Sequence, residues 1–292
     1  ESDSFFAPHM LRPPGDSHSK EIIVSSNEFF NAVNARQSEQ KTRLCIGLDP
    51  DPERFPAPIR RDKEPIFAFN KAVIDSTSDL ACCYKPQFAY YAANAAEREL
   101  EKTISYIRDL DIPVILDAKR GDVGSTAEKY ATEAFERYGA DAVTINPYLG
   151  LDAMQPFLAR AEKGIFILCR TSNPGGADIQ NLMIGGGDQL YEHIAGLASQ
   201  QWNGNNNVAL VVGATQPSEL TRVREITGDM TLLLPGIGAQ GGDVEASIKA
   251  GQGGGLIVSS SRAVLYASSG DDFAEAARKI AQSTRDEINQ HC

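Results

Sequence analysis

Eight apolar runs recur along this chain, and a stretch with helical periodicity follows each of them. The runs cover 43–48, 80–85, 113–119, 140–146, 164–170, 207–213, 230–236 and 254–260. Continuously apolar runs are typical of strands that are covered on both faces. Eight such units in 292 residues predict an α/β protein, a (β/α)8 TIM barrel that forms a single domain over 41–292. A doubly wound parallel sheet is the alternative, because alternation of strands and helices does not by itself require a closed sheet.

Residues 1–40 precede the first strand and read as an N-terminal tail followed by a helix. Residues 1–20 are rich in Pro, Ser and charged residues and show no periodicity, so we expect a tail there. Ser25 and Glu28 have the spacing of a capping box, and Phe29 and Val33 fall on one face of the helix after them. We expect this capping helix to pack against one end of the barrel.

The composition excludes several classes of protein. The net charge of −11 argues against nucleic acid as a general partner, since neutralising phosphates requires a basic face. No apolar run approaches the roughly 20 residues that span a bilayer, so no membrane association is expected. The four histidines and five cysteines lack metal-ligand spacing, and most of the cysteines lie in apolar runs. We therefore expect buried, reduced thiols in a cytoplasmic protein without a metal.

A charged cluster marks the end of the third predicted strand. In a barrel the active site lies where the strands end. Asp117 and Lys119 are two residues apart on that strand and should project to the same side, toward the barrel mouth, with Asp122 just beyond. Two carboxylates around a lysine keep it protonated and fix its position. The alternative is an Asp–Lys pair that only supports the structure.

A second feature joins the ends of strands seven and eight. The glycine-rich segment PGIGAQGGD spans 235–243, and Arg262 follows the last strand. Backbone amides of glycines can approach an anion closely and an arginine can clamp it, and barrels commonly bind phosphate at these two loops. The pair predicts a phosphate site, although either segment alone could be a simple turn.

These motifs resemble those of the orotidine 5′-phosphate decarboxylases. LDAKRGDVGST (116–126) is similar to the family signature D-x-K-x-x-D-x-x-x-T. The chain also has similar segments, in order and at matching strand ends from 43 to about 265: CIGLDPD, YKPQFAYY, RTSNPG, VVGAT and PGIGAQGGD. They resemble in particular the longer branch found in some bacteria and protozoan parasites.

The resemblance implies a carboxy-lyase that converts orotidine 5′-monophosphate to uridine 5′-monophosphate, the last step of de novo UMP synthesis. It implies no metal and no organic cofactor. Lys119 would protonate C6 of the pyrimidine, and Asp117 would lie against the substrate carboxylate. Lys85 and Asp122 would complete the charged tetrad of catalytic residues.

The resemblance also implies the residues that bind the nucleotide substrate. The ribose, pyrimidine and phosphate contacts would come from Asp49, Gln87, Thr126, Thr171 or Ser172, Gln240 and Arg262. Asp122 and Thr126 would reach the active site of the other subunit in a homodimer. The family usually has Gly before the phosphate arginine, whereas this chain has Ser261. Some members are fused to orotate phosphoribosyltransferase, so a fusion is a further possible partner.

Two other functions are weighed against this one. A sister decarboxylase of 3-keto-gulonate 6-phosphate shares the D-x-K-x-x-D strand but depends on magnesium and typically has an acidic residue in place of Lys85. A non-catalytic nucleotide-binding barrel would not need a lysine flanked by carboxylates. Lys85 and the complete Asp117, Lys119 and Asp122 set favour the nucleotide decarboxylase.

Overall fold

Eight parallel strands form one sheet in the order β2-β1-β8-β7-β6-β5-β4-β3. The computed structural model describes residues 27–214, 216–236 and 244–292. Isolated parallel bridges, Tyr84 with Val114 and Gln87 with Asp117, join β2 to β3 and complete the ring. The predicted barrel is therefore confirmed and the doubly wound alternative is wrong. The strands are β1 (Leu44–Leu48), β2 (Cys83–Pro86), β3 (Ile115–Arg120), β4 (Ala142–Ile145), β5 (Gly164–Arg170), β6 (Val208–Val212), β7 (Leu232–Pro235) and β8 (Leu256–Ser260).

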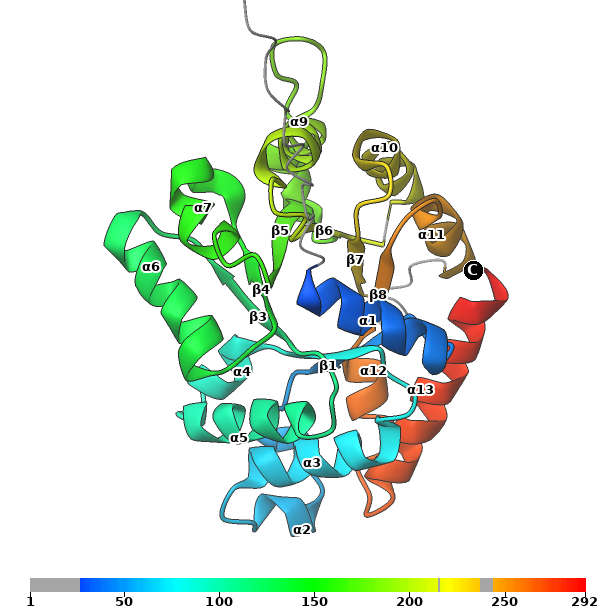
Figure 1. Cartoon of the computed structure of the whole chain (residues 1–292). Coiled ribbons are helices and arrows are strands. Elements are labelled where there is room, and N and C mark those ends of the chain that lie inside the picture. Colours follow the sequence, from blue (N-terminus) through cyan, green and yellow to red (C-terminus); the bar gives the residue numbers. More distant parts are fainter. Residues whose placement is uncertain (1–26, 215, 237–243) are drawn as a thin grey trace, which may run out of the picture.

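Helices surround the barrel and connect successive strands (Figure 1). The α-helices are α1 (Glu28–Glu39), α2 (Ala57–Arg60), α3 (Pro65–Thr77), α4 (Phe88–Ala92), α5 (Glu97–Arg108), α6 (Gly124–Thr132), α7 (Leu151–Leu158), α8 (Ala177–Gln180), α9 (Leu190–Leu197), α10 (Pro217–Thr227), α11 (Val244–Gly251), α12 (Arg262–Leu265) and α13 (Phe273–Gln290). Short 3₁₀ or π segments are η1 (Pro52–Arg54), η2 (Glu133–Arg137), η3 (Pro147–Leu149), η4 (Pro174–Gly176) and η5 (Ala198–Trp202). Within the described part of the chain, none of the helices combines the length and the apolar character needed to span a membrane.

Alternation along the strands separates two apolar cores. Leu44, Ile46 and Val114 pack in the larger cluster between strands and helices, whereas Cys45 and Ile115 belong to the smaller cluster inside the barrel. Side chains two residues apart on a strand point to the same face. The chain therefore directs Lys85 and Asp117, each two residues beyond an inward-facing Cys83 or Ile115, into the barrel near its C-terminal end.

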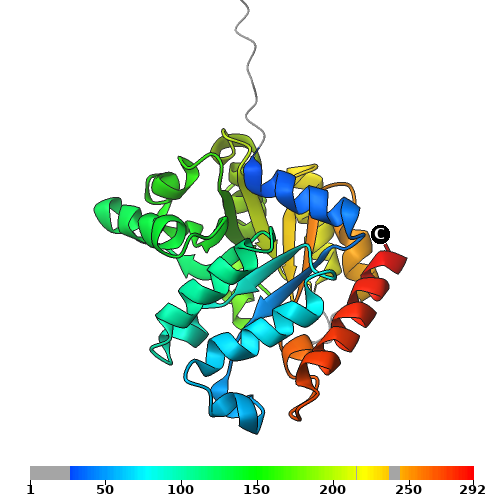
Figure 2. The same cartoon turned by 60° about the horizontal axis from the view of Figure 1, so that its bottom comes forward.

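Helix α1 covers the opposite end of the barrel, where the strands begin (Figures 1 and 2). Phe29 is buried in the interior cluster and meets the ring of Phe166 edge to face at 5.7 Å between centroids. The helix is capped by Asn27, whose Oδ1 accepts from the amide of Phe30 at 3.0 Å, and not by a Ser25–Glu28 box. Asn27 Nδ2 also donates to the carbonyl of Ala161, so tertiary contacts select this residue as the cap. Ser25 lies outside the described residues.

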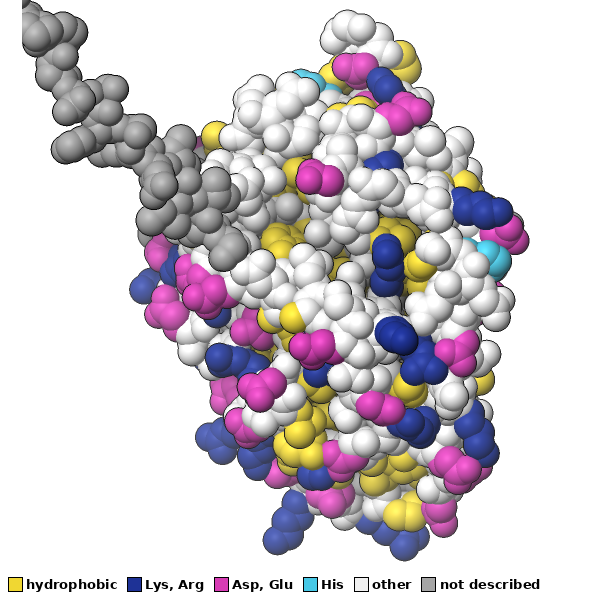
Figure 3. Space-filling model, turned by 45° about the vertical axis from the view of Figure 1, so that its right-hand side comes forward, with side chains coloured by type: hydrophobic (Ala, Val, Ile, Leu, Met, Phe, Trp, Pro, Cys, Tyr) yellow, Lys and Arg dark blue, Asp and Glu magenta, His cyan; other side chains and the backbone are white. Residues whose placement is uncertain are grey.

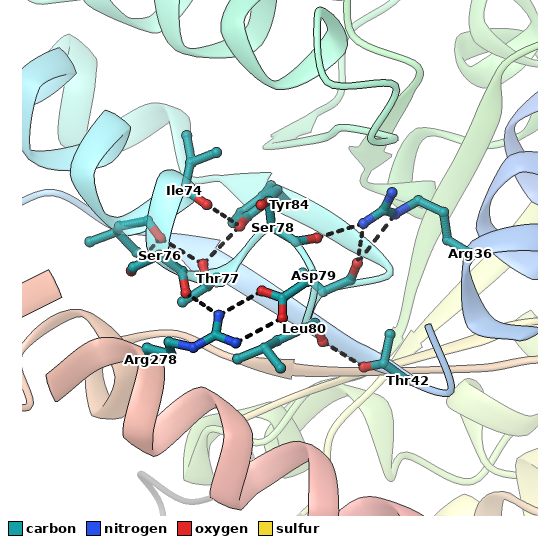
Figure 4. A network of polar contacts seen from close by, with 12 residues as sticks. Arg36, Thr42, Ile74, Ser76, Thr77, Ser78, Asp79, Leu80, Tyr84 and Arg278 are labelled. Atoms are coloured by element: carbon teal, nitrogen blue, oxygen red, sulfur yellow. Dashed lines mark hydrogen bonds and ion pairs between the residues drawn. The ribbon is translucent and has the colours of Figure 1, made fainter. Parts of the chain in front are cut away.

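A polar network ties α1 and the start of β1 to the turn between α3 and β2 (Figure 4). The guanidinium of Arg36 donates to the carbonyls of Ser78 and Ala81, and the hydroxyl of Thr42 donates to the carbonyl of Leu80 at 2.7 Å. These bonds satisfy backbone acceptors that the turn leaves outside the β-ladder. Helix α1 is thus an integral part of the barrel end.

Charges of both signs are interspersed on the right-hand side of Figure 1, which Figure 3 brings forward. Helix α13 contributes Arg278, paired with Asp79 on the turn after α3, and Lys279, paired with Glu275 one turn earlier. Exposed pairs of this kind contribute little to stability, because water and salt screen them. The stability of the barrel therefore rests on the two apolar cores.

We predict that Phe29→Ala lowers the free energy of unfolding by about 3–4 kcal/mol, because it opens a cavity between α1 and the barrel interior. Urea unfolding followed by circular dichroism measures the loss. Phe30→Ala is the matched control, since Phe30 is adjacent but only partly buried and should cost clearly less. An equal loss of unfolding free energy in the two variants would contradict the conclusion that Phe29 anchors α1 to the barrel interior.

Candidate active site

Three charged side chains form a continuous chain of ion pairs inside the C-terminal end of the barrel. Lys85 Nζ lies 2.8 Å from Asp117 Oδ2, and Lys119 Nζ lies 2.6 Å from Asp117 Oδ1. The Asp117 and Lys85 side chains are 9% and 7% exposed, whereas that of Lys119 is 44% exposed. One carboxylate is thus buried between two ammonium groups, of which only one reaches the open mouth.

The electrostatics of the cluster favour the charged forms. Burial alone would raise the pKa of Asp117, but the charges of Lys85 and Lys119 and their hydrogen bonds hold it well below its usual range. Burial alone would lower the pKa of Lys85, but attraction to Asp117 and Asp49 raises it above its usual range. The site therefore holds fixed, ionised groups where a ligand can meet them.

Strand β3 is not regular at this point, contrary to the expectation from the two-residue spacing. Its register against β4 shifts between Leu116 and Arg120, and Lys119 adopts a left-handed backbone with φ of 47°. Thr144 on β4 lies next to this irregular part of β3, and its hydroxyl donates to Asp117 Oδ1 at 2.9 Å. Sequence reasoning missed Thr144, because a lone threonine in an apolar run carries no signal of its own.

A pocket opens beside the charged cluster at the strand ends. Its lining residues come from the ends of β1, β2, β3, β5, β7 and β8: Asp49, Lys85, Gln87, Asp117, Ser172, Pro235, Gly236, Ser259, Ser261 and Arg262. Six of the site residues expected from the sequence therefore share one pocket. Ser259 was not assigned a role, although its place at the end of a strand could have suggested one.

Asp49 presents an unused acceptor in this pocket. Its Oδ1 is buried and has no hydrogen-bond partner among the described residues. Its backbone is fixed, because the hydroxyl of Tyr266 donates to the carbonyl of Asp49 at 2.7 Å and accepts from the amide of Asp51 at 2.6 Å. A buried acceptor without a partner is costly unless a ligand supplies the donor.

The segment after β5 brings Ser172, but not Thr171, to the pocket. The hydroxyl of Thr171 is occupied, since it donates to Asn173 and accepts from Gln180 Nε2 at 2.9 Å. Gly213 permits the approach: a Cβ there would lie 2.7 Å from the amide nitrogen of Ser172. Of the two residues expected for the pyrimidine, the pocket is lined by Ser172.

At the end of β8, Ser261 is accommodated by a glycine on the neighbouring strand. A Cβ at Gly47 would lie 2.7 Å from Cβ of Ser261, so the two positions depend on each other. Arg262 is exposed, lines the pocket and makes no ion pair with the described residues. Gln240, the other residue expected to hold the phosphate, lies outside the described residues.

Asp122 and Thr126 do not line this pocket within a single chain. Among the described residues, Asp122 Oδ1 accepts only from the amide of Val123, and α6 begins without a side-chain cap. Asp122 therefore does not act as a side-chain cap of its own helix α6. Thr126 is exposed on the first turn of α6.

Comparison with known proteins now assigns the barrel to a family. Residues 42–280 match the model of the "Orotidine 5'-phosphate decarboxylase / HUMPS family". A protein of Azoarcus sp. (strain BH72) named orotidine 5'-phosphate decarboxylase is 56% identical over 268 residues, which are 90% of this chain and 99% of that protein. The chain belongs to the orotidine 5′-phosphate decarboxylase / HUMPS family.

Solved structures agree with the family assignment. The Leishmania donovani OMP decarboxylase is 38% identical, superposes with a TM-score of 0.78, and the match covers 90% of this chain and 98% of that one. The Leishmania donovani UMP synthase is 39% identical with a TM-score of 0.78, but the match covers only 57% of that longer chain. This chain thus shares its barrel with nearly the whole of the Leishmania donovani OMP decarboxylase.

For this member of the family, we predict that Asp117→Asn destabilises the fold by about 3–5 kcal/mol near neutral pH, because it leaves Lys85 buried without its partner. The native pKa of Asp117 is lowered, so its stabilising charge is present above the usual carboxyl pKa of about 3.9 and is lost as the pH falls through the lower native value. The difference in unfolding free energy between wild type and variant should therefore shrink below about pH 4.

Urea unfolding at a series of pH values measures this difference. The matched control is Glu275→Gln, which removes an exposed carboxylate paired with Lys279 on α13 and should change little at any pH. A difference for Asp117→Asn that stays constant from neutral to acid pH would contradict the coupled Lys85–Asp117–Lys119 cluster.

Proposed function

We propose that the protein decarboxylates orotidine 5′-monophosphate to uridine 5′-monophosphate and acts as a carboxy-lyase. The observation that carries the proposal is the Lys85–Asp117–Lys119 chain of ion pairs: Lys85 and Asp117 line the pocket, and the half-exposed Lys119 lies beside it through its ion pair with Asp117. Relatives that match nearly the whole chain and are named for this activity support the same substrate.

The cluster suits a reaction that leaves an electron pair on carbon. When the bond between C6 and the carboxylate breaks, the pair stays on C6 and CO2 departs. The Lys119 ammonium stabilises this pair and then transfers a proton to C6, after which solvent reprotonates the lysine. Asp117, 2.6 Å from the same ammonium, lies where it would repel the substrate carboxylate but not the departed CO2.

The pocket offers matching contacts for the rest of the nucleotide. The unpartnered Oδ1 of Asp49 and the side chain of Gln87 suit ribose hydroxyls. Ser172 suits the polar edge of the pyrimidine. Arg262, exposed and without an ion pair among the described residues, suits the phosphate, together with Gln240 as predicted from the sequence.

The geometry favours this reaction over the two alternatives. The sister decarboxylase of a sugar phosphate depends on magnesium, and a buried Lys85 ammonium beside Asp117 would repel a cation there. A non-catalytic binding barrel gains nothing from a half-exposed lysine held against a carboxylate beside the pocket. We therefore propose turnover without a metal or organic cofactor.

The proposal predicts that the purified protein removes the absorbance of orotidine 5′-monophosphate in buffer with EDTA and no added metal.

Lys119→Ala should lower kcat by about 10²- to 10⁴-fold or more while the fold persists, because a half-exposed side chain adds little to the core. Lys129→Ala, an exposed lysine on α6, is the matched control and should leave kcat unchanged.

Each contrary result has a distinct meaning. Activity that disappears with EDTA and returns with Mg²⁺ would favour the sugar-phosphate type of enzyme. Tight binding of uridine 5′-monophosphate without turnover would favour a binding protein. A kcat of Lys119→Ala close to that of the wild type would contradict the role of Lys119 as the proton donor.

We further propose that two copies form a homodimer in which Asp122 and Thr126 serve the partner's site. Apolar side chains are exposed near Asp122 on the segments that follow β3 and β4: Val123 by 54%, Tyr148 by 83%, Leu149 by 43% and Leu151 by 41%. The loops lie together, since a Cβ at Gly121 would be 3.3 Å from Cβ of Asn146. An exposed apolar patch beside unassigned polar residues supports an interface at this point.

Subunit mixing tests the shared site. Lys119→Ala and Asp122→Ala are each expected to be nearly inactive alone. If Asp122 acts across the interface, each heterodimer has one doubly altered site and one intact site, so random mixing restores about a quarter of wild-type activity. No recovery after verified subunit exchange would place Asp122 in its own chain's site and contradict the shared-site arrangement.

Two further expectations belong to this proposal. The buried free thiols of Cys45, Cys82, Cys83 and Cys169 suit a reducing compartment such as the cytoplasm. The match to part of the longer Leishmania donovani UMP synthase supports a barrel that also occurs within longer proteins. Fusion to orotate phosphoribosyltransferase therefore stays a prediction for this chain.

A further inference from the structure

The backbone of β3 loses its regular pairing with β4 just where the charged cluster is built. Leu116 pairs with Val143 and Arg120 pairs with Ile145, so four steps along β3 match two steps along β4. The ladder resumes beyond the irregularity, where the amide of Asn146 donates to the carbonyl of Arg120 at 2.7 Å. The intervening amides of β3 therefore need an acceptor other than the β4 backbone.

The side chain of Thr144 supplies that acceptor. Its Oγ1 accepts from the amide of Ala118 at 3.0 Å and from the amide of Lys119 at 2.9 Å. The same hydroxyl donates its proton to Asp117 Oδ1 at 2.9 Å. A hydroxyl has one proton and two lone pairs, so every hydrogen-bonding position of Thr144 is used.

We infer that Thr144 is a positioning residue for the decarboxylation proposed above. It is buried, and its hydroxyl is fully used by Asp117, Ala118 and Lys119, so it would not touch the substrate. It acts through two groups that would, because its hydroxyl orients the carboxylate of Asp117 and holds the left-handed backbone of Lys119. A bulky residue with positive φ persists only where its surroundings fix it. Here the hydrogen bonds from two backbone amides to the Thr144 hydroxyl do so.

The arrangement makes the hydroxyl, and not the volume of the side chain, the essential feature. Thr144 is 1% exposed, so water cannot replace a missing hydroxyl without a rearrangement. Thr144→Val keeps the shape but removes the acceptor of two amides and the donor to Asp117. Thr144→Ser keeps the hydroxyl and removes only a methyl group.

We expect Thr144→Val to lower kcat by about 10- to 100-fold, because the Lys119 ammonium is no longer held in position for proton transfer. KM should change by less than about threefold, since the ribose and phosphate contacts proposed for Asp49, Gln87 and Arg262 are untouched. Thr144→Ser should restore kcat to within about threefold of wild type. The measurements are steady-state decarboxylation of orotidine 5′-monophosphate and the affinity for uridine 5′-monophosphate.

Thr42→Val is the matched control for lost buried hydrogen bonding. Thr42 is also 1% exposed, and its hydroxyl accepts from the amide of Leu44 and donates to the carbonyl of Leu80 at the opposite end of the barrel. This variant should lose thermal stability, as Thr144→Val does, but keep the wild-type kcat per folded molecule. If Thr144→Val does not fold, Thr144→Ala against Thr144→Ser gives the same comparison.

Three results would overturn the role of Thr144. They are a wild-type kcat in both hydroxyl-free variants, a Ser variant as impaired as the Val or Ala variant, or an equal loss of kcat in Thr42→Val. The inference rests on the proposed function, and the two failures are distinguishable. A wild-type protein without turnover contradicts the proposed function, whereas an active wild type with an equally active Thr144→Val contradicts only the role of Thr144.

Discussion

Asp117 remains ionised inside the barrel because two ammonium groups flank it, and the rest of the candidate site depends on this arrangement. Burying one carboxylate is unfavourable, and here the cost is offset by Lys85 on β2 and Lys119 on the same strand. The cluster requires that β2 and β3 be neighbours, which the closure of the barrel provides. It also requires a local departure from strand geometry, since the Lys119 ammonium returns to Asp117 from a left-handed backbone. Closure and irregularity together produce a fixed positive centre at the pocket mouth.

The strands and their inward faces could be predicted from the sequence, because both follow from local patterns. Continuous apolar runs located all eight strands to within a few residues, and the charged ends of those strands indicated where polar side chains would meet. The bulge in β3 could not be predicted, since it depends on a hydroxyl from another strand, Thr144 on β4. The prediction of the capping residue of α1 was wrong for a similar reason. Asn27 is the cap because its side chain also donates a hydrogen bond to the distant carbonyl of Ala161.

The residue types found around the pocket also depend on tertiary contacts that the local sequence does not show. Ser261 departs from the glycine expected by resemblance, and the sequence alone left its consequence open. The structure pairs it with Gly47 on the adjacent strand β1, where any side chain would collide with it. Gly213 likewise makes room for Ser172 from the strand next to β5. In both cases a glycine on a strand or directly after it sets what the neighbouring loop can present to the pocket, and this follows only from the assembled barrel.

The charge of the site also bears on product release under the proposed function. The chain carries a net charge of −11, yet Lys85 and Arg262 line the pocket with the carboxylates of Asp49 and Asp117, and Lys119 adds a third cation beside it through its ion pair with Asp117. A substrate with a phosphate and a carboxylate is attracted to this centre, but its carboxylate must approach Lys119 where Asp117 repels it. Loss of CO2 removes that repulsion together with the attraction to Lys119. The product is then held mainly through its ribose and phosphate, so binding and chemistry depend on different residues of the same pocket.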